Sequence, residues 1–135
     1  MSLKKVILFA FVIMALGTVL ELYLLNHYED KLQLIPILCI GLVILTAILL
    51  VFLRTPLVKG IFKFILVITA LSGIYGSYLH LLANYEFELE MTPTASNLDL
   101  LSESLSGALP ALAPFSMIVL ALIGYSYLII INQKQ

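Results

Sequence analysis

Both histidines of this 135-residue chain lie close to tyrosine, carboxylate or amide side chains. Imidazole and carboxylate groups are ligands that Zn, Mn and Fe ions accept from proteins. No Glu-x-x-His or His-x-x-x-His pair is present, so the pattern is not that of a standard helix-borne metal motif. It predicts a pocket for a divalent transition metal (Zn, Mn or Fe) or a small polar ligand, built from Glu21, His27, Glu29, His80, Asn84 and Glu86, with Tyr28, Tyr85, Glu88 and Glu90 as supporting residues.

Glu21 and His80 are expected to lie side by side, because each falls roughly 22 to 26 Å along its helix from the same end. An ionisable side chain at such depth in a membrane costs several kcal/mol unless it is paired or hydrated. The pair is therefore either part of the pocket or a buried ion pair that joins two helices. Haem ligation by His27 and His80 is disfavoured, because His27 sits at a helix end, about 120° round from Glu21.

The elements that must position these residues are predicted from composition. Hydrophobic residues make up 62% of the chain and charged residues 11%, and the mean hydropathy is +1.13, far above that of a soluble domain. Four apolar runs, about 6–26, 34–53, 61–84 and 108–131, each match the roughly 20 residues that a membrane-spanning helix needs. We expect an all-α polytopic membrane protein, one transmembrane domain over 1–135, whose four helices form a small bundle.

Two connecting segments carry further expectations. The outer loop 85–107 is predicted to hold a short interfacial helix, capped by Ser96 or Asn97. Pro110 and Pro114 each remove a backbone donor near the start of the last run, so the freed carbonyls are expected to line the same outer pocket. The first run has an alternative reading as a cleaved signal peptide, since Lys4 and Lys5 precede it.

The charge distribution predicts the topology. Basic loops resist translocation, so lysine and arginine mark the cytoplasmic side. Both termini are then cytoplasmic in a bacterial inner membrane, with six of the seven basic residues inside and every acidic residue on or toward the outside. The net charge of -1 argues against nucleic acid as a partner. The expected partners are the lipid bilayer and, as alternatives, a second copy of the chain or a larger membrane complex.

Two patterns along the helices add detail. Small and polar residues of the third run share one narrow face, which we expect to contact protein and not lipid: Thr69, Gly73, Gly76, Ser77, His80 and Asn84. Residues 24–36 and 81–93 share six identities in thirteen positions. This similarity suggests either two repeated helical hairpins or chance likeness at two helix ends.

Two stretches, HLLANYEFELEMTP at 80–93 and GALPALAPFSM at 107–117, resemble segments of an uncharacterised family of small four-helix bacterial integral membrane proteins. The resemblance implies the four-helix architecture and no particular activity. The position of Glu21 is also similar to that of the membrane glutamate of small multidrug transporters, whose surrounding motif is absent from this sequence.

Three functions fit these features. The leading one is an integral membrane protein with an outward-facing His/Glu/Asn pocket that binds a divalent metal ion or small polar ligand. The others are a structural or accessory subunit of a membrane complex and a proton-coupled small transporter that acts as a dimer. No nucleophile paired with a base, no phosphate-binding loop and no cofactor signature is present, so the sequence gives no positive indication of catalysis.

Overall fold

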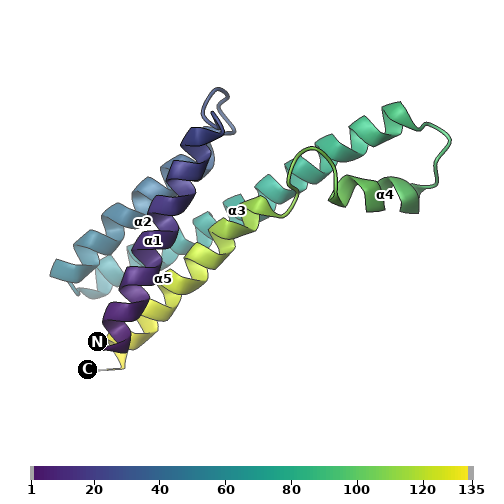
Figure 1. Cartoon of the computed structure of the whole chain (residues 1–135). Helices are drawn as coiled ribbons and strands as arrows, with labels where there is room; N and C mark the ends of the chain where they lie inside the picture. The colour runs from purple at the N-terminus through teal and green to yellow at the C-terminus, as the bar shows by residue number, and fades with distance from the viewer. Residues whose placement is uncertain (1, 134–135) are drawn as a thin grey trace.

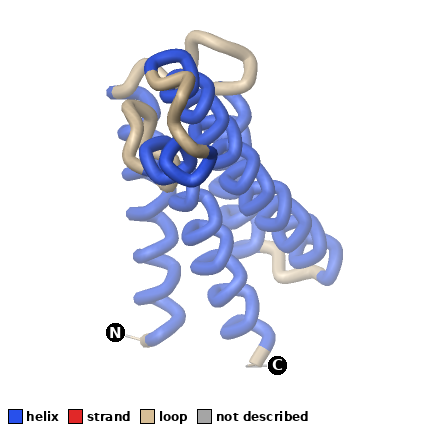
Figure 2. The backbone as a smooth tube through the Cα atoms, turned by 90° about the vertical axis from the view of Figure 1, so that its right-hand side faces the viewer, coloured by secondary structure: helices blue, strands red, loops and turns tan. Residues whose placement is uncertain are grey.

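The chain folds into helices joined by short connections. The computed structural model describes residues 2–133, which form five α-helices and one short 3₁₀ helix and contain no strand (Figures 1 and 2). The prediction of an all-α fold is confirmed. The elements are α1 (Leu3–Leu24), α2 (Leu34–Phe52), α3 (Pro56–Met91), α4 (Asn97–Leu105), the 3₁₀ helix η1 (Ala113–Phe115) and α5 (Ser116–Asn132).

Four of these segments, α1, α2, α3 and η1 with α5, are long and apolar enough to cross a membrane. Both ends of the described chain lie at one end of the bundle (Figure 1). We call this the basal end; it also holds the turn 53–55. The opposite, apical end carries the loop 25–33 and the tip of α3 with α4 (Figure 1).

Close packing between α3 and α5 forms the centre of the bundle. A side chain at Gly73 would place its Cβ 2.7 Å from the backbone oxygen of Pro114, and one at Gly124 would lie 2.6 Å from Leu66. These two glycines let the helices approach closely. Phe11 brings α1 onto the same core, where its ring meets that of Phe62 edge-on, with centroids 6.1 Å apart.

The third helix is longer than predicted. It begins at Pro56, not 61, because Thr55 caps it and proline is favoured in the first turn. It also continues to Met91, through the stretch 85–91 that was expected to be loop. Its 36 residues span about 54 Å, well beyond the roughly 30 Å of a hydrocarbon core.

The extra turns of α3 pair with α4 to form a helical arm, residues 84–105, that projects from the apical end (Figure 1). The predicted short helix is present, and Ser96 caps it by accepting a hydrogen bond from the Asp99 N–H. It packs on α3 through Leu100 and Ser104, which are buried. A neighbouring face of α4 is apolar and exposed: Leu98, Leu101 and Leu105.

The last long helix starts later than the predicted residue 108. Proline lacks the backbone N–H that an α-helix needs, so Pro110 and Pro114 leave residues 107–112 irregular and 113–115 as a 3₁₀ turn. The α-helix begins only at Ser116. Residues 107–112 therefore form a short non-helical linker beside α3.

The two similar segments adopt different local structures. Asn26 has a positive φ of 53° and ends the first helix, whereas Ala83, its counterpart at an offset of 57, lies inside α3. Asparagine tolerates the left-handed conformation and alanine favours the helix. The similar sequences of residues 24–36 and 81–93 therefore do not form similar helix ends.

Candidate functional site

The end of α1 positions His27. The N–H of His27 donates to the Leu22 carbonyl oxygen at 2.8 Å, and the N–H of Asn26 donates to the Tyr23 carbonyl oxygen at 3.1 Å. With Asn26 in the left-handed conformation, this is a Schellman cap. The cap reverses the chain at one residue and fixes the backbone of His27 against the last turn of α1.

The backbone carbonyl of Pro110 orients His80. Pro114 has no N–H to donate to this oxygen, which accepts instead from the N–H of Ala113 at 3.1 Å and keeps a second lone pair for another donor. The His80 Nδ1 atom lies 3.1 Å from it. A carbonyl can only accept, so Nδ1 carries a proton, and in the uncharged tautomer with this proton Nε2 has a lone pair for a ligand. The broken turn thus lies beside His80.

Asn84, one helical turn beyond His80, holds the same linker. Its Nδ2 donates to the carbonyl oxygens of Ser104, at 2.9 Å, and Leu109, at 2.7 Å. Its Oδ1 accepts from the N–H of Leu109 at 3.0 Å. A Cβ at Gly107 would approach the Asn84 amide to 2.6 Å, so only glycine fits there. Asn84 is 3% exposed and its amide is occupied by the backbone.

The two histidines meet at the apical end. Their ring centroids are 6.3 Å apart with an interplanar angle of 70°. His27 lies outside the long helices and is partly buried; burial lowers its pKa from the ordinary 6.5, and the charge of His80 lowers that pKa further. The surroundings of His27 therefore favour its uncharged imidazole, which is the metal-binding form.

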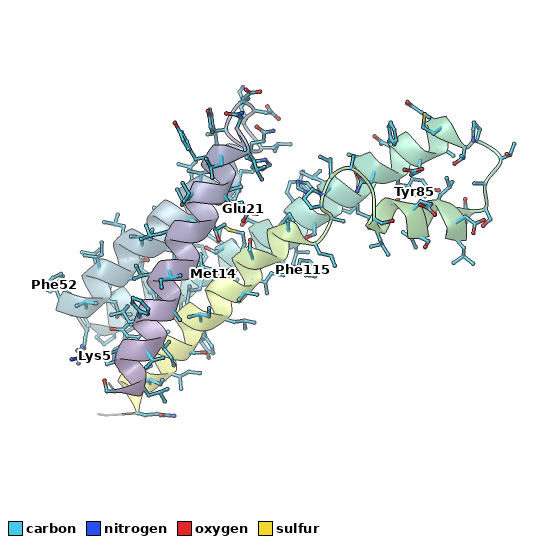
Figure 3. All side chains as sticks on the ribbon, viewed as in Figure 1. Lys5, Met14, Glu21, Phe52, Tyr85 and Phe115 are labelled. Atoms are coloured by element: carbon cyan, nitrogen blue, oxygen red, sulfur yellow. The ribbon has the colours of Figure 1, made fainter. Side chains whose placement is uncertain are left out.

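Glu21 lies differently from the expectation. It is exposed, and among residues 2–133 no ion pair joins it to His80. At 100° per residue it falls about 80° from the buried face of α1, which runs through Phe11, Ala15 and Thr18. This helix packs on α5 and α2. Figure 3 shows Glu21 near the apical end of α1.

The remaining candidate residues are spread over two regions. In the loop, the backbone N–H groups of Glu29 and Asp30 donate to Gln33 Oε1, and Tyr28 donates its hydroxyl to Asn26 Oδ1. The others lie on the arm, where Figure 3 places Tyr85: Tyr85, Glu86, Glu88 and Glu90. Within the part of the chain that the structure describes, no three His, Cys, Asp or Glu side chains are grouped closely enough to hold a metal ion.

Two groups outside the predicted set of site residues also belong to the site. The Pro110 carbonyl contacts the His80 ring, and two prolines four residues apart were the sequence signal for it. Ser77 lies on the polar face of α3 that was expected to contact protein. Its Oγ is buried one turn before His80, and no hydrogen-bond partner for it exists in the described structure. The sequence placed Ser77 on this face but could not show that its hydroxyl lacks a partner.

The fold and site together define a small helical bundle with four long apolar helices and an apical pair of imidazoles. No family model, no curated protein and no solved structure matches this chain.

Proposed function

We propose that this chain is a multi-pass protein of a bacterial inner membrane whose outer face binds a divalent transition metal ion through His27 and His80. The observation that carries the proposal is the pairing of the two rings, 6.3 Å apart, with His80 Nε2 left free by the bond to Pro110. Metal-bound histidines commonly donate their second ring N–H to a backbone carbonyl.

The spacing of the rings lies within about 1 Å of that needed for a shared ion. Zn–N bonds of about 2.0–2.1 Å at a tetrahedral angle put the centroids of two ligating imidazoles roughly 5 Å apart, so the rings would move together by about 1 Å on binding the ion. Two imidazoles do not fill a coordination sphere, so water supplies the other ligands. Asn84 acts in this proposal as a positioning residue, because it holds the linker whose carbonyl orients His80.

The test is cobalt and zinc binding by the purified, chelator-treated protein in detergent. Co²⁺ should produce visible absorption bands typical of nitrogen ligation, and equilibrium dialysis should give one Zn²⁺ per chain. His27→Ala and His80→Ala should each weaken binding by about 10- to 100-fold. Glu88→Gln, a change on the arm, serves as the matched control and should bind like the unmodified chain. Wild-type protein that takes up neither ion, or histidine variants that bind normally, would contradict the proposal.

A second candidate is a structural or accessory subunit of a membrane complex. This role is favoured because the polar face of α3 packs inside the bundle, where polar residues can serve to hold helices together. Thr69, Gly73, Ser77 and Asn84 are all buried within one chain. In that case His80→Ala would loosen the linker 107–112 without any change in metal content.

A further inference from the structure

A cleft of about 270 Å³ lies between α3 and α5 on the side of the bundle. Its walls are four positions of α3, from Lys63 to Ala70, and four positions of α5, from Ile118 to Tyr125. Both sets have the spacing i, i+3, i+4 and i+7, which marks one face of a helix. The cleft is therefore a straight groove that runs along both helices.

The groove is polar at one end only. Helix α3 leaves the basal end and α5 returns to it, so Lys63 and Tyr125 are the most basal residues of their two walls. The other lining side chains are apolar, and small ones, Ala70 and Ala121, help to hollow the groove. Lys63 and Tyr125 are both exposed. A groove with a cation and a hydroxyl at its basal end, and hydrocarbon beyond, matches the layout of an anionic phospholipid.

The charge at one end of the groove favours a lipid over a partner helix. Seven residues of helix give the groove a length of about 10 Å, enough for part of one acyl chain. The ammonium group of Lys63 at its basal end calls for an anion, which a phospholipid head group supplies. A second groove, of about 190 Å³, lies between α1 and α2. It is lined only by apolar side chains and has no cation or hydroxyl at either end.

We propose that the α3–α5 groove binds an anionic phospholipid of the basal leaflet, with the phosphate at Lys63 and Tyr125 and an acyl chain along the groove. Basic pockets between membrane helices hold anionic head groups in this way. The proposal rests on membrane insertion and is independent of the histidine pair.

Native mass spectrometry of the full chain, delipidated and titrated with phosphatidylglycerol or phosphatidylcholine, tests it. Phosphatidylglycerol should be retained preferentially, and Lys63→Gln combined with Tyr125→Phe should reduce its retention by about fivefold or more. Lys5→Gln removes a basal charge on α1, outside the groove, and should leave retention unchanged.

A matched pair of filling variants separates the groove from general surface charge. Val67→Phe fills the α3–α5 groove, and Val12→Phe fills the groove between α1 and α2; both valines are partly exposed. Only Val67→Phe should reduce retention of phosphatidylglycerol, with helix content unchanged by circular dichroism. Equal retention of the two lipids, equal effects of Lys63→Gln and Lys5→Gln, or a protein dimer that Val67→Phe dissociates would each overturn the proposal.

Discussion

His27 and His80 are held by different kinds of contact. A helix cap fixes the backbone of His27, while a hydrogen bond from the ring to Pro110 fixes the side chain of His80. The hydrogen bond sets the tautomer of His80, whereas no hydrogen bond holds the ring of His27 in the part of the chain that the structure describes. A ligand that bridges the two would reorient His27 more than His80.

The lowered pKa of His27 makes stability depend on pH. In the unfolded chain His27 takes up a proton near pH 6.5, but in the folded protein it does so only at lower pH. The unfolded state therefore binds more protons between these two values. The contribution of His27 to the free energy of unfolding is complete above about pH 6.5. It is lost as the pH falls through the pKa of His27 in the folded protein.

Thermal unfolding of the chelator-treated protein, followed by circular dichroism between pH 8 and pH 5, measures this dependence. The midpoint should be constant above about pH 6.5 and fall below it. His27→Asn should flatten the part of the curve that His27 causes, whereas Lys31→Gln, in the same loop, should not. A midpoint that rises on acidification would contradict the assignment.

At the scale of elements, α3 organises the bundle. The prediction that its small and polar face contacts protein is confirmed, since Gly73, Ser77 and Asn84 are buried. The absence of a side chain at Gly73 leaves room for the Pro114 backbone. Asn84 binds the linker 107–112, which leads to Pro114. One face of one helix thus positions both the start of α5 and the carbonyl that orients His80.

Alanine substitutions at two glycines should have opposite effects. A Cβ at Gly73 would lie 2.7 Å from a backbone oxygen, so Gly73→Ala should force α3 and α5 apart and destabilise the fold by about 1–3 kcal/mol. Gly17 has no neighbouring atom within 4 Å of an added Cβ. Gly17→Ala should therefore be neutral or stabilise α1 by up to about 1 kcal/mol.

Unfolding of the detergent-solubilised variants by sodium dodecyl sulfate, monitored by circular dichroism, provides the comparison. Gly41→Ala is a second control, because it too has open space around the added methyl group. If Gly73→Ala were as stable as Gly17→Ala, the close approach of α3 to Pro114 would not be needed for the packing of these helices.

The whole molecule is polarised from end to end. The basic residues at the basal end are Lys4, Lys5, Arg54, Lys59 and Lys63; Lys134, the sixth expected there, lies outside the described residues. All eight acidic residues belong to the apical half of α1, the loop 25–33 or the arm. Such an asymmetry supports the expected topology, with the basal end in the cytoplasm.

Cysteine labelling tests that topology. In a Cys39→Ala background, Glu29→Cys should react with a membrane-impermeant thiol reagent on sealed right-side-out vesicles. Lys5→Cys should react only after permeabilisation, because the expected topology places the basal end inside. Cys39 is buried and is removed to leave one reporter. The reverse pattern would invert the bundle and place the histidine pair inside the cell.

How much of the molecule could be predicted from sequence depends on the range of the forces involved. Hydropathy is a sum over neighbouring residues, so the long apolar helices and their order could be read directly. The exact ends of the helices were harder to predict than their existence. Leu24 ends α1 because Asn26 turns the chain, and α3 runs to Met91 because no breaker intervenes.

The helical class, the separation of charge and the capped short helix could all be predicted, because they follow from local composition. Which side chains meet depends on how the helices pack against one another. Glu21 and His80 have similar depths, but depth along a helix does not fix rotation or the angle between helices. The rotation of α1 and the angles between the helices leave Glu21 on an exposed face. They place His27, in an irregular loop, next to His80.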